Sequence, residues 1–268
     1  MPDFLTVCEQ AARAGGAILL DWQERFTARE KAPKDLVTEA DLASQQAIRQ
    51  IVLGAFPDHD FLGEEDAALD IREKSGTSGG RPAEYRWIVD PLDGTANYVH
   101  KLQTFAVSIA LEQNGRIIVG VVFDPISGEL YHAVSGQGAF LNGARLNTSG
   151  CRQLEQAMVA FSFSPNVERA SLEIRRFIEV LLATQSVRRL GSAALNLAYV
   201  AAGRLDSYWA TSVKSWDVAA GVLLVREAGG ILTHVSGGAF DLENPEFLAS
   251  ASADLQQRML DVLARAEV

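Results

Sequence analysis

The sequence predicts a layered α+β fold, in which helices lie between and outside β-sheets. Three observations support this prediction: helix-spaced apolar residues near the N-terminus, short strands joined by turns over residues 104–134, and alternating strands and helices from residue 158 onward. Such alternation is typical of sheets that bury their faces against helices. The chain has 268 residues, of which 48% are hydrophobic, so it can bury a large core.

The N-terminal part is expected to be helical. Apolar spacing places one helix over residues 3–26 and a second from about Thr38 to Phe56. Asp41 follows Thr38 at the spacing of a helix-capping pair. Residues 70–86 are polar and rich in Gly and Ser, and we expect them to form an exposed, mobile loop.

Strands dominate the middle of the chain. Residues 87–90 indicate a buried strand that runs into a strand-to-helix turn. Asn114-Gly115 between apolar runs predicts a hairpin within the 104–134 meander. In the second half, strands are expected at 158–163, 187–191, 204–210 and 231–235, and helices at 167–184, 192–203, 216–230 and 254–265.

Composition narrows the classes of function. A net charge of −10 argues against nucleic acid or an anionic membrane as the main partner, because both are held by clustered Lys and Arg. Cys8 and Cys151 form no CxxC motif, so a zinc site is not expected. Two distant cysteines do not make a disulfide scaffold, so we expect the protein to work in the reducing cytoplasm. Asp3 and Glu9 interrupt the N-terminal apolar stretch, which therefore does not resemble a signal peptide. The four histidines lack ligand spacing.

The segment WIVDPLDGTANYVH, residues 87–100, is the most informative. Asp90 ends an apolar strand, Asp93 follows it on a turn stiffened by proline, and Gly94 and Thr95 open a helix. Two carboxylates on a rigid turn suit a hard divalent cation such as magnesium. The adjoining helix start offers backbone N–H groups to a phosphate. An ordinary Asp-Pro-Gly turn is the alternative interpretation.

Three further acids recur in similar positions. Glu64 follows a short apolar stretch, Asp217 opens an apolar helix, and Asp41 lies one turn into a helix. Each alone could be an acidic loop, a helix cap or a helix-dipole partner. Together with the 87–100 segment they form a pattern that ordinary caps and turns rarely produce.

The ordered blocks DLVTEAD, FPDHDFLGEE, WIVDPLDGTANYVH, GSAALNLAYVAAGRLD and SWDVAAGVLLVREAGG resemble the inositol monophosphatase family of lithium-sensitive, magnesium-dependent phosphatases. The match spans about residues 34–230. It implies a layered αβαβα sandwich of the inositol monophosphatase and fructose-1,6-bisphosphatase type. It also implies a small phosphorylated metabolite as partner, and a homodimer.

The resemblance implies the metal ligands. Glu64, Asp90 and the Leu92 carbonyl would hold one Mg²⁺, and Asp90, Asp93 and Asp217 a second, with a weaker third ion near Glu64. On this basis we expect residues 1–145, an α+β half, to carry most metal ligands. Residues 146–268, an α/β half, would carry Asp217 and the substrate contacts.

The resemblance also implies the catalytic and substrate groups. Asp41, paired with Thr95, would orient and deprotonate a metal-activated water, with Glu64 as a further catalytic residue. The amides of Gly94 and Thr95 would hold the phosphate. The expected substrate contacts are Gly191, Ser192 and Ala193.

One departure from the family pattern leaves the identity of the substrate undecided. Inositol-preferring members carry a glutamate seven residues before the helix aspartate, and this chain has Ala210 there. The leading prediction is hydrolysis of an inositol 1-phosphate-like or related sugar or polyol phosphate. The alternatives are histidinol phosphate, fructose 1,6-bisphosphate or a nucleotide phosphate as substrate, or a non-catalytic regulator that binds sugar phosphate and metal.

Overall fold

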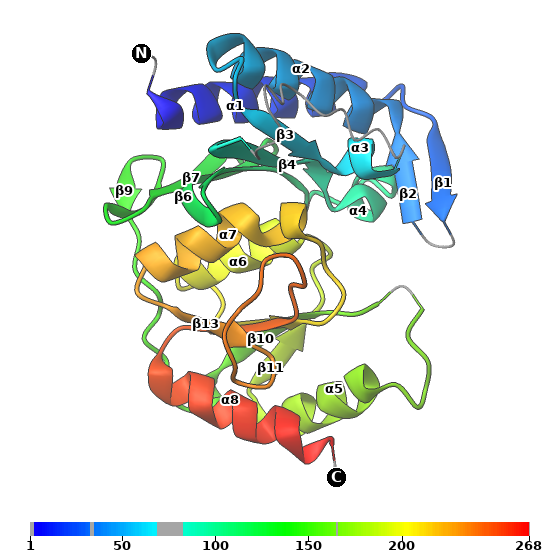
Figure 1. Ribbon diagram of the computed structural model, residues 1–268. Coiled ribbons are helices and arrows are strands. Elements are labelled where there is room, and N and C mark those ends of the chain that lie inside the picture. Colours follow the sequence, from blue (N-terminus) through cyan, green and yellow to red (C-terminus); the bar gives the residue numbers. More distant parts are fainter. Residues whose placement is uncertain (1–2, 33–34, 69–82, 165, 268) are drawn as a thin grey trace.

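The computed structural model describes residues 3–32, 35–68, 83–164 and 166–267, and its elements stack in alternating helical and sheet layers (Figure 1). A seven-stranded sheet and a five-stranded sheet are separated by one helical layer and covered by two others. The predicted αβαβα order is confirmed. The outer layers are α1 (Phe4–Trp22) with α2 (Glu39–Ala55), and α5 (Leu172–Ala183) with α8 (Ala253–Arg265); the central layer is α6 (Ala193–Ala201) with α7 (Ser215–Glu227).

The seven-stranded sheet is the predicted meander, extended at both ends. In spatial order its strands are β3 (Asp60–Gly63), β4 (Tyr85–Asp93), β5 (Ala106–Gln113), β6 (Arg116–Asp124), β7 (Glu129–Val134), β8 (Gly138–Leu141) and β9 (Ala144–Arg145). Only β3 and β4 pair in parallel. The predicted hairpin is confirmed: Asn114 and Gly115 both have positive φ, as a tight turn between twisted strands requires.

The five-stranded sheet mixes parallel and antiparallel pairs. Its spatial order is β11 (Ser186–Arg188), β10 (Met158–Ser162), β12 (Ser207–Ala210), β14 (Phe247–Ser250) and β13 (Ile231–His234). β10 is parallel to both neighbours, whereas β14 is antiparallel to both of its own. A separate hairpin, β1 (Ala28–Ala32) with β2 (Asp35–Thr38), precedes α2. Short helices α3 (Glu64–Ala68) and α4 (Thr95–Val99) and a 3₁₀ turn, η1 (Leu154–Gln156), complete the described chain.

Several sequence-based boundaries were wrong. The first helix ends at Trp22 rather than residue 26, and neither the β1–β2 hairpin nor β14 was predicted. Tyr85 and Arg86 belong to β4, so the expected 70–86 loop is too long at its end; residues 69–82 lie outside the described residues. β4 also continues beyond Asp90 to Asp93, with a register shift against β5 between them.

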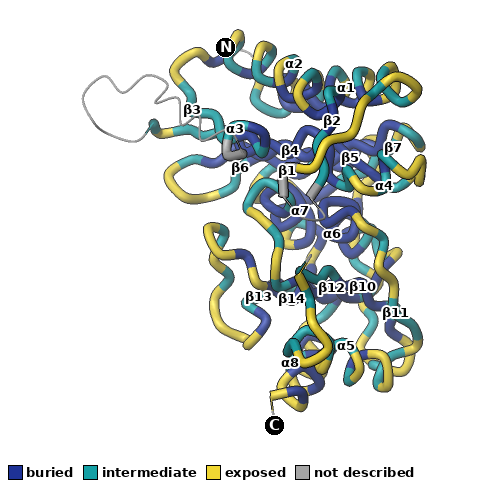
Figure 2. The backbone as a smooth tube through the Cα atoms, turned by 90° about the vertical axis from the view of Figure 1, so that its right-hand side faces the viewer, coloured by how far each residue is buried: buried dark blue, intermediate teal, exposed yellow. Residues whose placement is uncertain are grey.

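The largest hydrophobic cluster joins the two sheets through α6 and α7. It includes Val122 on β6, Leu197 on α6, Leu224 on α7 and Ala249 on β14. Buried backbone is concentrated in these inner layers (Figure 2). α7 lies flush on β6 because Gly120 has no side chain there: a Cβ would stand 2.8 Å from the Ala220 carbonyl oxygen. The proposed division at residue 145 falls between β9 and η1 and stays a prediction.

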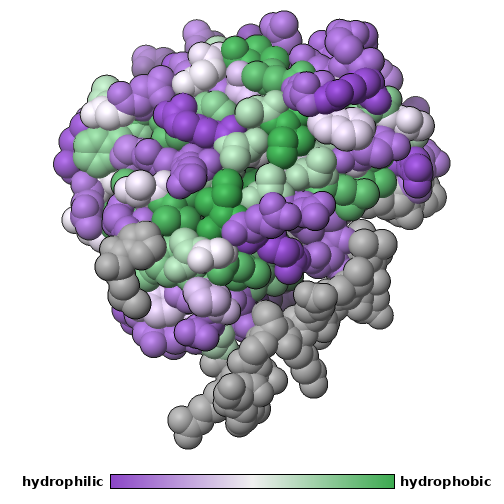
Figure 3. All heavy atoms as spheres, turned by 90° about the horizontal axis from the view of Figure 1, so that it is seen from above, coloured by the Kyte–Doolittle hydropathy of each residue, from purple (hydrophilic) through white to green (hydrophobic). Residues whose placement is uncertain are grey.

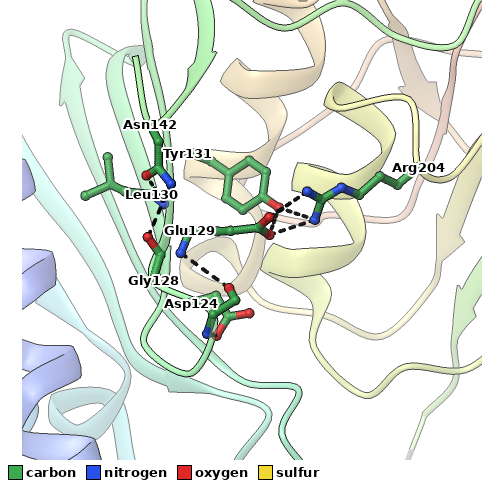
Figure 4. Close-up of polar contacts among 8 residues, drawn as sticks. Asp124, Gly128, Glu129, Leu130, Tyr131, Asn142 and Arg204 are labelled. Carbon is green, nitrogen blue, oxygen red and sulfur yellow. Dashed lines mark hydrogen bonds and ion pairs between the residues drawn. The ribbon is translucent and has the colours of Figure 1, made fainter. Parts of the chain in front are cut away.

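A polar network fastens Arg204, just beyond the end of α6, to β7 (Figure 4). Arg204 donates two hydrogen bonds to the carboxylate of Glu129, at 2.6 and 2.7 Å, and a third of 2.9 Å to the Tyr131 hydroxyl. The Tyr131 hydroxyl itself donates to Glu129 at 2.6 Å. Bidentate pairing of this kind fixes orientation more strongly than a single contact.

The face formed by α1 and α2 carries apolar side chains along its middle, flanked by hydrophilic ones (Figure 3). Leu20 and Leu42 contribute exposed apolar surface on these helices. Among the described residues, no helix combines the length and apolar character needed to cross a bilayer.

Candidate active site

Asp90 and Asp93 lie at the carboxyl end of β4, and both are buried, with exposures of 2% and 7%. The strand bulges between them, which turns both side chains of this short segment toward the same region. The backbone amide of Leu92 donates a 2.9 Å hydrogen bond to Oδ1 of Asp90. Ser44 of α2 donates a 3.1 Å hydrogen bond to the carbonyl of Pro91, which holds the turn against the outer helical layer.

Glu64 is brought beside this turn by the neighbouring strand. β3 is parallel to β4, with Gly63 opposite Val89, so Glu64 leaves the sheet at the same edge as Asp90. Gln45 of α2 holds the turn, because its Oε1 accepts a 3.0 Å hydrogen bond from the Glu65 amide. A Cβ on Gly63 would overlap that side chain, so a larger residue here would displace Gln45 from its hydrogen bond.

Asp217 reaches the same region from the central helical layer. It occupies the first turn of α7, where its Oδ2 accepts a 2.8 Å hydrogen bond from the Lys214 amide. Ser108 of β5, which lies opposite Asp90 in the sheet, donates a 3.3 Å hydrogen bond to the carbonyl of Trp216. Asp217 therefore caps α7, which is the alternative that the sequence left open. It also lies beside β4 and β5.

The carboxylate of Asp93 also caps α6. Its Oδ1 accepts a 3.2 Å hydrogen bond from the Ala193 amide, and its Oδ2 accepts one of 2.7 Å from the Ala194 amide. Ser192 donates a further hydrogen bond to Oδ2 from its hydroxyl, which in turn accepts the Leu195 amide at 3.2 Å. Ala193 is one of the expected substrate contacts, and its amide donates to Asp93 in this structure.

The four carboxylates act on one another electrostatically. Burial raises the pKa of Asp90 well above its ordinary value, and the charges of Glu64, Asp93 and Asp217 raise it further. Burial also raises the pKa of Asp217, with Asp93 and Glu64 adding to the rise. Burial raises the pKa of Asp93 to about 6, against the opposing effect of its hydrogen bonds. These acids therefore form one cluster with strong mutual repulsion.

The cluster suits a hard divalent cation in its donor chemistry. Carboxylate and carbonyl oxygens are the ligands magnesium takes, and a buried group of like charges is stabilised by a bound cation. In the part of the chain that the structure describes, no three His, Cys, Asp or Glu side chains already stand in ligating positions. The ligand roles of Glu64, Asp90, Leu92, Asp93 and Asp217 stay predictions.

The expected pair of Asp41 and Thr95 is in contact. Asp41 is fully buried in the first turn of α2, and Thr95 begins α4. The Thr95 hydroxyl lies 3.3 Å from Oδ1 of Asp41 and 3.1 Å from the Leu92 carbonyl oxygen, and both atoms can accept its proton. Thr38 fixes the carboxylate, since its amide and hydroxyl donate to Oδ2 at 2.8 and 2.6 Å. The predicted capping of α2 by Thr38 and Asp41 is confirmed.

Gly94 and Gly191 bring the two expected phosphate and substrate segments together. Both have positive φ, 97° and 85°. A Cβ on Gly94 would lie 3.3 Å from the Gly191 carbonyl oxygen and 3.0 Å from that of Thr104. Side chains at these positions would be strained and crowded, so glycine permits the approach.

Asn97 holds this approach in place, a role that its sequence context did not indicate. Its side-chain amide donates hydrogen bonds of 2.6 Å to the Thr104 carbonyl and 2.7 Å to the Leu190 carbonyl. Ser44 and Gln45 were missed in the same way. The available signals were an Asn inside the 87–100 motif and two polar residues on the buried side of α2.

Ala210 ends β12, is fully buried and joins the core that surrounds α6.

Comparisons with known proteins agree with this geometry. The model of the inositol monophosphatase family matches residues 3–267. An inositol-1-monophosphatase from Mesorhizobium japonicum is 41% identical over 253 residues, which are 91% of this chain and 90% of that protein. A Nus factor SuhB from Pseudomonas aeruginosa is 39% identical over 255 residues, which are 93% of this chain and 92% of that protein.

The fold matches as well. A solved structure of inositol monophosphatase from Anabaena (Nostoc) superposes with a TM-score of 0.83 at 34% sequence identity, and the match covers 98% of this chain and 95% of that one. Family model, relatives and fold all agree over nearly the whole length, and they support hydrolysis of phosphate monoesters. The chain belongs to the inositol monophosphatase family.

Proposed function

We propose that this protein hydrolyses a small phosphate monoester in a magnesium-dependent reaction, with an inositol 1-phosphate-like or related sugar or polyol phosphate as substrate. The observation that carries the proposal is the hydrogen bond between Thr95 and the buried Asp41, directly beside the turn that holds Asp90 and Asp93. A protein that only binds a sugar phosphate needs the acids but not this pair.

The acidic cluster is the proposed magnesium site. Glu64, Asp90, Asp93, Asp217 and the Leu92 carbonyl would hold two or three ions per subunit, with Asp90 shared. Magnesium, when bound, would neutralise charge on the phosphoryl group and lower the pKa of a coordinated water. Asp90 is well suited to a shared position because it is 2% exposed and feels the charges of the other three acids.

The protein's own groups position and deprotonate the attacking water. The Thr95 hydroxyl donates a hydrogen bond to Asp41, so the lone pairs of the Thr95 oxygen can accept one from the attacking water. As the water loses a proton to Thr95, the hydroxyl proton of Thr95 passes to Asp41. The amides of Gly94 and Thr95 hold the phosphoryl oxygens. The water oxygen bonds to phosphorus as the ester P–O bond breaks on the opposite side. The leaving oxygen takes a proton from solvent, and the products are an alcohol and inorganic phosphate.

Several finer features go with this proposal. Histidinol phosphate, fructose 1,6-bisphosphate and nucleotide phosphates are the alternative substrates, because Ala210 supplies no acceptor for a ring hydroxyl. The family resemblance supports inhibition by lithium and a homodimer, and the cysteine pattern supports a cytoplasmic location. Light scattering at several protein concentrations tests the dimer.

The second candidate is a non-catalytic regulator that binds metal and sugar phosphate. Relatives such as the Pseudomonas aeruginosa protein carry the name Nus factor SuhB rather than that of an enzyme. This candidate predicts that magnesium and phosphate esters raise the melting temperature without any phosphate release.

The experiment is a phosphate-release assay across inositol phosphates, histidinol phosphate, sugar bisphosphates and nucleotide monophosphates. We expect turnover with magnesium, none with a chelator, and recovery when magnesium is returned. Asp90→Asn should lose turnover, whereas Asp254→Asn, an exposed acid at the start of α8, should not. Turnover that survives chelation, or no turnover on the whole panel, would contradict the proposal.

A further inference from the structure

Glu173 holds together two segments that leave the five-stranded sheet. It lies in the first turn of α5 and is partly buried. Its Oε1 accepts a 3.1 Å hydrogen bond from the Ser164 amide and a second hydrogen bond from the Thr211 hydroxyl. Ser164 follows β10 and Thr211 follows β12, so one carboxylate oxygen bridges the chain beyond both strands.

The two segments leave the sheet at the same edge. β10 and β12 are parallel neighbours, with Ser162 opposite Ala210. In open α/β sheets, ligands bind beyond the carboxyl ends of parallel strands, and β10 and β12 form such a parallel pair here. The chain that leads from β10 into α5 lies on the same side of the molecule as α3 and α4, which begin at Glu64 and Thr95 (Figure 1).

A hydrogen bond between these two strands lies near the acidic cluster. The hydroxyl of Tyr208, on β12, lies 2.9 Å from that of Ser162, on β10. Burial raises the pKa of Tyr208, and the charges of Asp93 and Asp217 add to the rise, so these acids lie near it. Glu173 therefore lies just beyond the ends of β10 and β12, and Tyr208, near the end of β12, lies close to the acidic cluster.

The two oxygens of the Glu173 carboxylate differ in their hydrogen bonding. Both hydrogen bonds go to Oε1, and within the described residues Oε2 accepts none. An ionised carboxylate has about four lone-pair positions, so it can accept further donors. Hydroxyl groups are donors of this kind, whereas a second phosphate would be repelled.

We propose that Glu173 is a specificity-determining residue, whose Oε2 accepts a hydrogen bond from a substrate hydroxyl remote from the phosphate. The site would then favour phosphate monoesters of polyols over phosphates without hydroxyls and over bisphosphates. This inference rests on the proposed function, because it assigns the alcohol part of the same substrate.

A purely structural role for Glu173 makes a different prediction. An acid in the first turn of a helix is favoured by the helix dipole, and the bridge to Ser164 and Thr211 would stabilise the loop alone. In that case a substitution would affect all phosphate esters equally. Comparing two substrates therefore separates the two roles.

The test uses Glu173→Gln, which keeps Oε1 as an acceptor and removes the charge. The substrates are inositol 1-phosphate and phenyl phosphate, assayed with magnesium. We expect the ratio of kcat/KM for inositol 1-phosphate to that for phenyl phosphate to fall about tenfold or more, mainly through KM, as expected for a lost hydrogen bond to a charged group. Glu168→Gln, an exposed acid on the preceding loop, is the matched control and should leave the ratio unchanged.

An unchanged ratio in Glu173→Gln would overturn the inference, whatever its melting temperature. Thr211→Val, which removes the hydroxyl that orients Glu173, should lower the ratio in the same direction by a smaller factor. Calorimetric binding of both esters gives the same comparison even if no phosphate is released. A failure of the proposed function therefore remains distinguishable from a failure of this inference.

Discussion

The backbone amide of Ala194 donates a 2.7 Å hydrogen bond to Oδ2 of Asp93. Asp93 ends a strand of the seven-stranded sheet, and Ala194 lies in the first turn of α6, in the central helical layer. One carboxylate thus satisfies the free N–H groups of a helix while it faces the other acids of the cluster. The proposed metal site and the anchoring of the α6 N-terminus to the end of β4 depend on the same side chain.

Asp93→Asn should therefore lose both activity and stability. An amide nitrogen in place of one oxygen faces backbone donors at Ala193 and Ala194, and the negative charge at the helix start is gone. We expect most turnover to be lost, a higher magnesium requirement, and a lower melting temperature in the presence of magnesium, where the cation offsets the repulsion between the acids. Phosphate release against magnesium concentration and thermal unfolding measure the two effects.

Asp124→Asn is the matched control for this change. Asp124 is also buried, at 4% exposure, and its Oδ1 accepts hydrogen bonds from the amides of Ile126 and Ser127. It should lose stability with little change in magnesium requirement. Near-normal turnover of Asp93→Asn at low magnesium would remove Asp93 from the proposed site.

Thr95→Ala tests the activation of water. The Thr95 hydroxyl lies between Asp41 and the Leu92 carbonyl, and its loss leaves Asp41 without its link to the reacting water. Positioned proton transfer contributes about 10²–10⁴-fold, so we expect kcat to fall at least about 100-fold with little change in KM. Thr95→Ser keeps the hydroxyl and should restore most of kcat. A variant that lost binding but kept its rate would show that Thr95 does not activate water.

Local chemistry made part of the fold predictable. The Asn114-Gly115 turn and the Thr38–Asp41 capping pair each depend on residues that are adjacent or nearly so, and both occur as expected. The β1–β2 hairpin and β14 could not be predicted in this way. β1 has the sequence AREKA and lacks an apolar face, and the four residues of β14 become a strand only between two partners.

In the candidate site, too, local features could be predicted and long-range contacts could not. The acids at 90 and 93 were recognisable because they share one turn. Glu64 and Asp217 stood out at the start of local elements, and the family resemblance gave them their ligand roles. The capping of α6 by Asp93 was beyond prediction, because it joins residues a hundred positions apart. Asn97 was missed for a similar reason, since its partners at 104 and 190 become visible only after folding.

Asn97→Ala should loosen the approach of Gly191 to Gly94. It removes two donors and leaves the carbonyls of Thr104 and Leu190 without them. The expected loss is about 2 kcal/mol in the free energy of unfolding, measured by urea denaturation, together with a raised KM. Asn244→Ala, which removes an exposed hydrogen bond to Asp241, should cost less than about 0.5 kcal/mol. Equal losses for the two variants would contradict a special role for Asn97.

Glu129 and Arg204 make stability depend on pH. Hydrogen bonds from Arg204 hold the pKa of Glu129 below its ordinary value, with burial acting in the opposite direction. The unfolded chain then binds this proton more readily than the folded chain, so the contribution of the pair rises with pH. It is fully present above the unfolded value of about 4.3 and is lost as pH falls through the lowered folded value.

Glu129→Gln should therefore lower the melting temperature at pH 7, and the difference from the unaltered protein should shrink as the pH falls below about 4. Thermal unfolding from pH 7 down to pH 3.5 measures this. Arg204→Met removes the cation and should abolish the pH-dependent part of this difference in melting temperature below about pH 4. The double variant Glu129→Gln with Arg204→Met should do the same. A difference between Glu129→Gln and the unaltered protein that stays constant over the whole range would show that the charge on Glu129 does not hold the segment after α6 against β7. The bridge in Figure 4 would then act through packing alone.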